Sequence, residues 1–150
     1  MTSIREYQFG DYFCLIRVID SVCEEGKWMH TAHFEPTEQW IQVLTESNCG
    51  HKLLVAINDD SIIGWCRIFI RGQAGDLGIG ILKAYRNQGV GTRLLQVAMN
   101  WAREHDLVVT LSCRTENLRA LHLFEKIGFV KSDFKSQMLA MVYTGESIYA

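Results

Sequence analysis

The stretch that decides the fold runs from Asp76 to His105 and reads DLGIGILKAYRNQGVGTRLLQVAMNWAREH. Its first residues alternate leucine and isoleucine with glycine, and this period of two is typical of a pleated strand. Its second half predicts an amphipathic helix, because apolar side chains recur there at helical spacing. Between the two lies a turn, Arg86 to Thr92, that contains Gly89 and Gly91. The stretch therefore predicts a strand, a glycine turn and a helix in direct succession.

A helix that follows a glycine turn offers an anion-binding site at its start. The first backbone N–H groups of the helix have no partner inside it, and the helix dipole adds partial positive charge. Gly89 and Gly91 let a phosphate approach this backbone without side chains in the way. A P-loop is excluded because no Gly-Lys-Ser/Thr follows, and a dinucleotide fingerprint because Leu94 stands where its third glycine belongs.

Composition narrows the classes of function. With 48% hydrophobic and 21% charged residues, the 150 residues are typical of one globular domain spanning residues 1–150. The net charge of −2 gives no electrostatic reason to expect a nucleic-acid partner. We see no signal-peptide core and no apolar run that could span a membrane. Five cysteines without a C-x-x-C pair indicate a reducing compartment, so we expect a cytoplasmic protein.

Periodicity and turn residues predict the other elements. We expect Asp11 as an N-cap, Pro36 in the first turn of a helix, and Asn117 as a second cap. The order is β-α-α-β-β-β-α-β-α-β-β, an α/β (α+β) fold with a mixed, mostly antiparallel sheet and helices on both faces. Besides the central stretch, the expected elements are strand 4–7, helix 11–23, a helix from residue 36 to about 47, strands 52–57 and 62–70, strand 107–113, helix 117–126, and strands 129–134 and 137–143.

Two motifs in this order resemble those of a known family. Arg86-x-x-Gly89-x-Gly91 after a strand is similar to the Gln/Arg-x-x-Gly-x-Gly/Ala pattern of the GNAT superfamily of acyl-CoA-dependent N-acetyltransferases. The segment from Asn117 to Phe129 resembles that family's Asn-x-x-Ala…Tyr-x-x-x-Gly-Phe segment, and the element order is also the family's. The resemblance implies an enzyme that moves an acetyl group from acetyl-CoA to an amine. Transfer should be direct, because no Gly-x-Ser-x-Gly or Cys/His nucleophile pattern occurs.

The resemblance assigns acetyl-CoA to the glycine turn. Its pyrophosphate is expected on backbone amides, with positive charge from Lys83, Arg86 and Arg93, although Arg93 suits a surface position equally well. Ile81 stands where family strands bulge, and its N–H should polarise the thioester carbonyl, an effect worth roughly 3 kcal/mol. Asn117 is expected either to contact the pantetheine arm or only to cap its helix. The expected cofactor-binding residues are Ile79, Ile81, Arg86, Asn87, Gln88, Gly89, Val90, Gly91, Thr92 and Asn117.

The expected catalytic residues are Ile81, through its backbone, and Asp76. Asp76 stands near the position of a family carboxylate that draws a proton from the amine, unless it is only a turn residue after Gly75. A weak base fits an amine of low pKa: at pH 7 a lysine-like amine costs about 4.6 kcal/mol to deprotonate, and an α-amine about 1 kcal/mol. Phe124 replaces the family's proton-donating tyrosine, which leaves Tyr85, Tyr143 or water.

The sequence determines less about the part of the site that would bind the acceptor amine. Trp28, His30 and Tyr85 are expected to shape the substrate site, with a solvated loop as the alternative. His30 and His33 have H-x-x-H spacing, but no metal is expected because no Glu or Cys partner completes a set. We expect a small-molecule amine or amino-acid-like acceptor; the alternatives are a protein N-terminal acetyltransferase, disfavoured by Ser112, or a catalytically weak acyl-CoA-binding module. No nucleic acid or membrane partner is expected, and a homodimer stays open.

Overall fold

The computed structural model describes residues 1–26 and 33–145, and in this part of the chain the strands form one sheet in the order β1-β2-β3-β4-β5-β7-β6. The strands are β1 (Thr2–Glu6), β2 (Lys52–Asn58), β3 (Ser61–Arg71), β4 (Ala74–Ile81), β5 (Val108–Arg114), β6 (Phe129–Lys135) and β7 (Met138–Tyr143). The helices are α1 (Tyr12–Glu24), α2 (Glu38–Thr45), α3 (Val90–Glu104) and α4 (Leu118–Ile127), with 3-10 turns at Phe9–Asp11 and Lys83–Tyr85. The predicted order of elements is confirmed.

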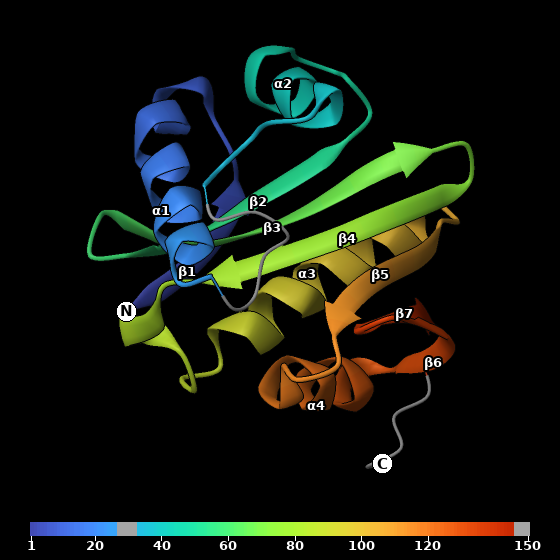
Figure 1. Ribbon diagram of the computed structural model, residues 1–150. Helices are drawn as coiled ribbons and strands as arrows, with labels where there is room; N and C mark the ends of the chain where they lie inside the picture. Colours follow the sequence, from blue (N-terminus) through green and yellow to red (C-terminus); the bar gives the residue numbers. More distant parts are fainter. Residues whose placement is uncertain (27–32, 146–150) are drawn as a thin grey trace.

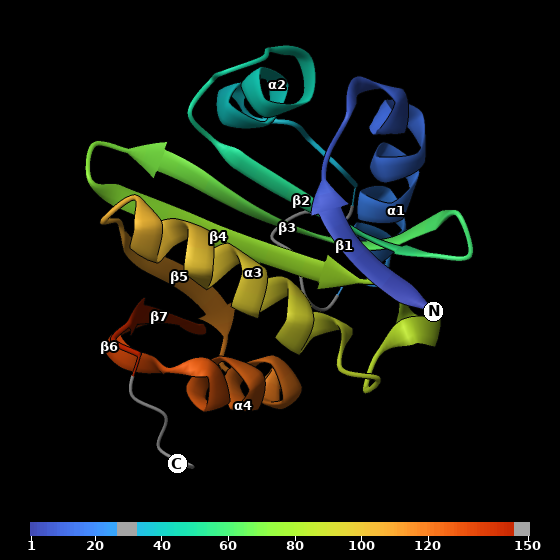
Figure 2. The same cartoon turned by 180° about the vertical axis from the view of Figure 1, so that it is seen from behind.

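Helices cover both faces of the sheet, as predicted (Figures 1 and 2). On one face α1 and α2 bury their apolar sides against Trp65 and Phe69 of β3. On the other face α3 and α4 pack on a second apolar cluster that includes Leu94, Leu95 and Phe129. Within the described ranges, no helix has the length and apolar character needed to cross a membrane.

The short pairing between β4 and β5, which we call the seam, is the feature that positions the site. It is the parallel pair of an otherwise antiparallel sheet, and its register runs only from Ala74–Val108 to Asp76–Thr110. Beyond Asp76 the two strands part. On its other edge β4 pairs with β3 along its whole length without a register shift. The bulge expected at Ile81 is therefore wrong, and the backbone near Ile81 loses a partner strand because β5 diverges.

Two local expectations at helix starts are corrected. The helix α2 begins after Thr37, whose hydroxyl caps its first turn, so Pro36 lies ahead of the helix and not in that turn. Asp11 does precede α1, but its carboxylate caps no N–H of that helix. It accepts hydrogen bonds from the Arg5 guanidinium and the Gln8 N–H instead. A charged partner in β1, 6 residues earlier in the chain, thus binds the carboxylate in place of the local cap.

Candidate active site

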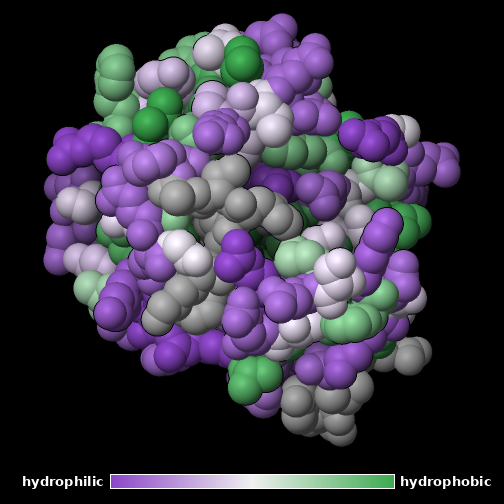
Figure 3. All heavy atoms as spheres, in the orientation of Figure 1, coloured by the Kyte–Doolittle hydropathy of each residue, from purple (hydrophilic) through white to green (hydrophobic). Residues whose placement is uncertain are grey.

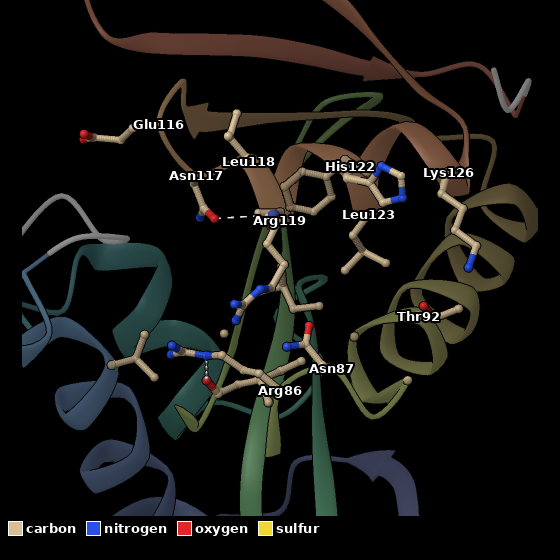
Figure 4. A pocket seen from close by; sticks show the side chains of 18 residues that line it. Arg86, Asn87, Thr92, Glu116, Asn117, Leu118, Arg119, His122, Leu123 and Lys126 are labelled. Atoms are coloured by element: carbon tan, nitrogen blue, oxygen red, sulfur yellow. Dashed lines mark hydrogen bonds between the residues drawn. The ribbon is translucent and has the colours of Figure 1, made fainter. Parts of the chain in front are cut away.

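A cavity of about 480 Å³ opens where β4 and β5 part (Figure 4). The end of β4, the glycine turn, the first turn of α3 and one side of α4 form its walls. Val22 of α1 also lines it, so the cavity reaches through the sheet towards the opposite face. In the orientation of Figure 1, the space-filling view shows a hollow near the middle of that face, with hydrophobic atoms between hydrophilic ones (Figure 3). The cavity therefore extends from α4 across the end of β4 to α1.

The backbone of Ile79 and Ile81 faces this opening. The N–H of Leu82 donates to Ile63 O of β3 at 2.8 Å. Because successive residues of a strand point their N–H groups to opposite edges, those of Ile79 and Ile81 point towards the β5 side. The carbonyl of Ile81 confirms this direction, since it accepts from Arg86 Nε at 2.9 Å, away from β3. Two N–H donors thus lie beyond the last β4–β5 register pair.

The two glycines of the turn serve different ends. Gly89 is the N-cap of α3 with φ of +81°, and Asn87 also has a positive φ of 62°. Alternating left-handed residues of this kind curl successive N–H groups around an anion. A Cβ on Gly91 would lie 2.9 Å from Leu123 Cδ2, so this glycine lets α3 begin close against α4. Gly89 is needed for its conformation and Gly91 for packing.

The guanidinium of Arg86 makes its hydrogen bonds to other groups of the protein. Its Nη1 and Nη2 donate to the two carboxylate oxygens of Glu25 at 2.8 and 2.6 Å, while Nε holds Ile81 O. Such a bidentate pair fixes the orientation of both groups. Arg93 donates to Thr2 O of β1 and does not line the cavity, and neither does Lys83. The predicted cluster of three cations therefore does not form; Arg86 instead ties the turn to the end of α1.

Positive charge comes from Arg119 and Lys126 of α4 instead. Arg119, His122 and Lys126 line the cavity, and Figure 4 shows Arg119 reaching into it towards Asn87. These three residues are not among the predicted site residues, although their spacing of three and four along a helix places them on one face. Asn117 also lines the cavity and caps α4 by accepting from Ala120 N–H at 3.3 Å, so its two interpretations are compatible.

Among the described residues, no tyrosine lines this cavity, so none replaces the family tyrosine that is Phe124 here. Phe124 lines the wall and is only 5% exposed, with its ring 5.8 Å from that of Phe129. Tyr85 packs partly buried against the apolar cluster under α3, and the Tyr143 hydroxyl accepts from Arg103. The phenylalanine therefore keeps this wall apolar, and neither Tyr85 nor Tyr143 lines the cavity.

Asp76 lies in a second cavity, of about 410 Å³, on the face that α2 covers. It is the third residue of β4 and not a turn residue. Its carboxylate accepts from Arg67 Nη1 at 2.9 Å, and the Arg67 guanidinium stacks 4.3 Å from the Phe69 ring centroid. Trp40 of α2 and Thr110 of β5 complete the cavity, which we call the Arg67 groove. Asp76 is thus an ion-paired carboxylate at an open surface.

Two of the predicted substrate residues, Trp28 and His30, fall outside the described residues, so the structure says nothing of them. His33 is described, and its ring lies within 4.8 Å of carboxylate oxygens of Asp20 and Glu24 on α1. The Asp20 carboxylate also accepts from the Phe34 N–H at 2.8 Å. These contacts fix the chain that enters α2 against α1, on the side of the Arg67 groove.

Comparisons with known proteins agree with this geometry. The model of the Acetyltransferase (GNAT) family matches residues 15–129. Streptothricin acetyltransferase A of Bacillus subtilis (strain 168) is 30% identical over 121 residues, which are 71% of this chain and 68% of that protein. A GNAT acetyltransferase structure from Streptococcus pneumoniae has a TM-score of 0.82 at 25% identity, covering 95% of this chain and 98% of that one. PaiA N-acetyltransferase from Thermoplasma acidophilum, solved with coenzyme A, shares the fold at 18% identity, with a TM-score of 0.76 and coverages of 95% and 98%.

Proposed function

Because the chain belongs to the acetyltransferase (GNAT) family, we propose that it moves an acetyl group from acetyl-CoA directly to the amine of a small-molecule or amino-acid-like acceptor. The observation that carries the proposal is the parting of β4 and β5 beside the open start of α3. The similarity to streptothricin acetyltransferase A supports a small acceptor. Length, composition and cysteine usage support a cytoplasmic globular domain.

The cavity fits the parts of acetyl-CoA. Amides from Asn87 to Thr92 and the dipole of α3 would receive the pyrophosphate, and Arg119 and Lys126 would add positive charge from α4. The pantetheine arm would then run between β4 and α4, past the side chain of Asn117. Arg86 contributes by holding the turn and the carbonyl of Ile81 in place.

The chemistry follows from the two N–H groups at the opening. The amine nitrogen attacks the thioester carbon, a C–N bond forms, and the oxygen takes negative charge next to the N–H of Ile79 or Ile81. The C–S bond then breaks, CoA leaves as thiolate, and the proton lost by the nitrogen passes to water. Since Asp76 is paired with Arg67, an acceptor that is already neutral in part suits the site. The α-amine of a peptide or an amino-acid amide becomes neutral near pH 7 at a cost of about 1 kcal/mol. The amine of a free amino acid costs more, because the neighbouring carboxylate stabilises its charged form.

A thiol-release assay tests the proposal. Protein, acetyl-CoA and a panel of small amines are mixed, and free CoA thiol is followed with a thiol-reactive dye. We expect release with at least one amino-acid-like amine. A weak CoA-binding module is the second candidate, because Phe124 cannot donate a proton to the thiolate. If CoA raises the melting temperature yet no amine or peptide N-terminus releases thiol, the second candidate replaces the first.

The position of the pyrophosphate is tested separately by Gly89→Glu. The new carboxylate would face the phosphates, and we expect CoA affinity to fall at least about tenfold, the loss of roughly 1.4 kcal/mol of binding free energy. Gly72→Glu is the matched control, since Gly72 also has a positive φ, +63°, with nothing within 4 Å of an added Cβ. Isothermal titration with CoA measures both variants. Equal affinities for the two would show that the pyrophosphate lies elsewhere.

A further inference from the structure

We propose that Arg67 binds a carboxylate of the acceptor, so that the preferred acceptor is an amine with a carboxylate on the neighbouring carbon. The inference rests on the proposed function, because it names the acceptor class of the same site. It follows from the place of the Arg67 guanidinium, the donors this group leaves open, and the charge of the groove around it.

Arg67 lies beside the reacting position. In the β3–β4 register it stands opposite Gly78, and a Cβ on Gly78 would be 2.7 Å from Arg67 Cζ and Nε. The guanidinium therefore covers the Gly78 backbone, on the face towards α1 and α2. The next residue is Ile79, whose N–H faces the opening. Since a strand rises about 3.3 Å per residue, the guanidinium is about one residue from Ile79 and three from Ile81 along β4. The inference therefore places the thioester oxygen at the N–H of Ile79.

The guanidinium still has donors to offer. Both hydrogen bonds that it makes within the described ranges leave from Nη1, to the backbone and carboxylate oxygens of Asp76 at 2.9 Å each. No buried side-chain nitrogen or oxygen in these ranges lacks a partner, so the edge formed by Nε and Nη2 is not fully buried. Arg67 lines the groove, and this edge is the one that a ligand there could reach. The side chain is held there, only 20% exposed, between Asp76 and the ring of Phe69. A fixed guanidinium edge is the usual bidentate partner of a carboxylate.

The surroundings favour an acceptor that is both anionic and apolar. Among the described residues lining the Arg67 groove, Arg67 and Arg71 outnumber the single carboxylate of Asp76. The excess positive charge attracts a carboxylate and disfavours a purely polycationic amine. Trp40 and Phe69 give the groove aromatic walls. In an α-amino acid the nitrogen and the carboxylate share one carbon, which matches the adjacent positions of Ile79 and the guanidinium.

Matched acceptors test this assignment. Phenylalanine and phenylalaninamide share the aromatic side chain and the α-amine but differ in the carboxylate. We expect kcat/KM per neutral amine, from thiol release, to be at least tenfold higher for phenylalanine. Arg67→Gln should remove this preference by raising KM for phenylalanine alone. Arg67→Lys, which keeps the charge but not the two-donor edge, should retain part of it. Arg71→Gln, which removes a charge of the groove but leaves the guanidinium of Arg67, should retain most of it.

Each other result has a definite meaning. If no amine of any kind releases thiol, the proposed function fails and this inference fails with it. If the wild type turns over the amide as well as phenylalanine, the function holds and the acceptor class is wrong. Equal losses in Arg71→Gln and Arg67→Gln would mean that general charge acts, and not Arg67. Melting temperature and CoA affinity are measured for every variant; should Arg67→Gln fail to fold, Arg67→Lys with an undiminished preference overturns the assignment.

Discussion

Two glycines of β4 decide which side chains of β3 reach the middle of the sheet. A Cβ on Gly80 would lie 2.1 Å from the Trp65 ring, and one on Gly78 would meet the Arg67 guanidinium. Without side chains on these two residues, both large groups lie flat across β4. The alternating pattern predicts the strand from sequence, but it gives no reason for the glycines. That reason lies in β3, whose register with β4 is fixed only in the folded sheet.

Replacing Gly80 by alanine should destabilise the protein by about 1–3 kcal/mol, the usual cost of overpacking a filled core. Trp65 is only 2% exposed and is packed against α1 and α2, so its ring cannot move aside cheaply. Gly10→Ala is the control, because nothing lies within 4 Å of an added Cβ there. Urea denaturation measures the free energy of unfolding of both. A Gly80→Ala protein as stable as the wild type would contradict the position of the Trp65 ring.

Arg86 and Asn117 show which roles of single residues can be predicted. The cap formed by Asn117 involves Ala120, three residues away, and local patterns predict such contacts. The partner of Arg86 is Glu25, which is 61 residues away along the chain. A motif predicts that an arginine stands near the turn, but not that a distant carboxylate engages it. The same limit explains why the charge at the cavity, which comes from α4, was assigned to the turn.

At the scale of elements, His51 joins α2 to β3. Its Nδ1 accepts from Ile70 N–H at 2.9 Å, so Nε2 carries the ring proton and donates to Gln42 Oε1 at 3.0 Å. Burial lowers the pKa of His51 from its usual 6.5. Protonation of Nδ1 would break the bond to Ile70. The neutral ring is therefore part of the contact between the helix and the strand.

This contact should make stability depend on pH. Below pH 6.5 the unfolded chain takes up a proton at His51 that the folded chain refuses, so the free energy of unfolding falls as pH decreases. At pH 7.5 this contribution is fully present. We expect His51→Gln to be less stable than wild type at pH 7.5 and to lose less stability between pH 7.5 and 5.5. The exposed His105→Gln serves as control, and urea denaturation at both pH values gives the comparison. A wild-type slope unchanged in His51→Gln would contradict this role.

At the scale of the whole molecule, the sheet consists of two parts joined by a short seam. One part is β1 to β4 and the other is β5 to β7, and the register between them covers only Ala74–Asp76 with Val108–Thr110. The order of elements, the two helical faces and the glycine turn were predictable, because periodicity and turn residues are local signals. The length of the seam could not be predicted, because the point where two strands part depends on how the helices pack on each half of the sheet.

The seam gives the final prediction, which concerns individual backbone amides. In the protein without CoA, the amides of Ile79 and Ile81 should exchange with solvent faster than that of Leu82, which donates to Ile63 O at 2.8 Å. All three lie at one end of β4, so the contrast arises from the direction of each N–H and not from local opening. Acetyl-CoA should slow the Ile81 or Ile79 amide at least tenfold and leave Leu82 nearly unchanged. Amide-resolved hydrogen exchange by NMR measures this. An equal ligand effect at all three amides would contradict the prediction. It would mean that CoA closes the seam as a whole and does not bind the two N–H donors that lie beyond it.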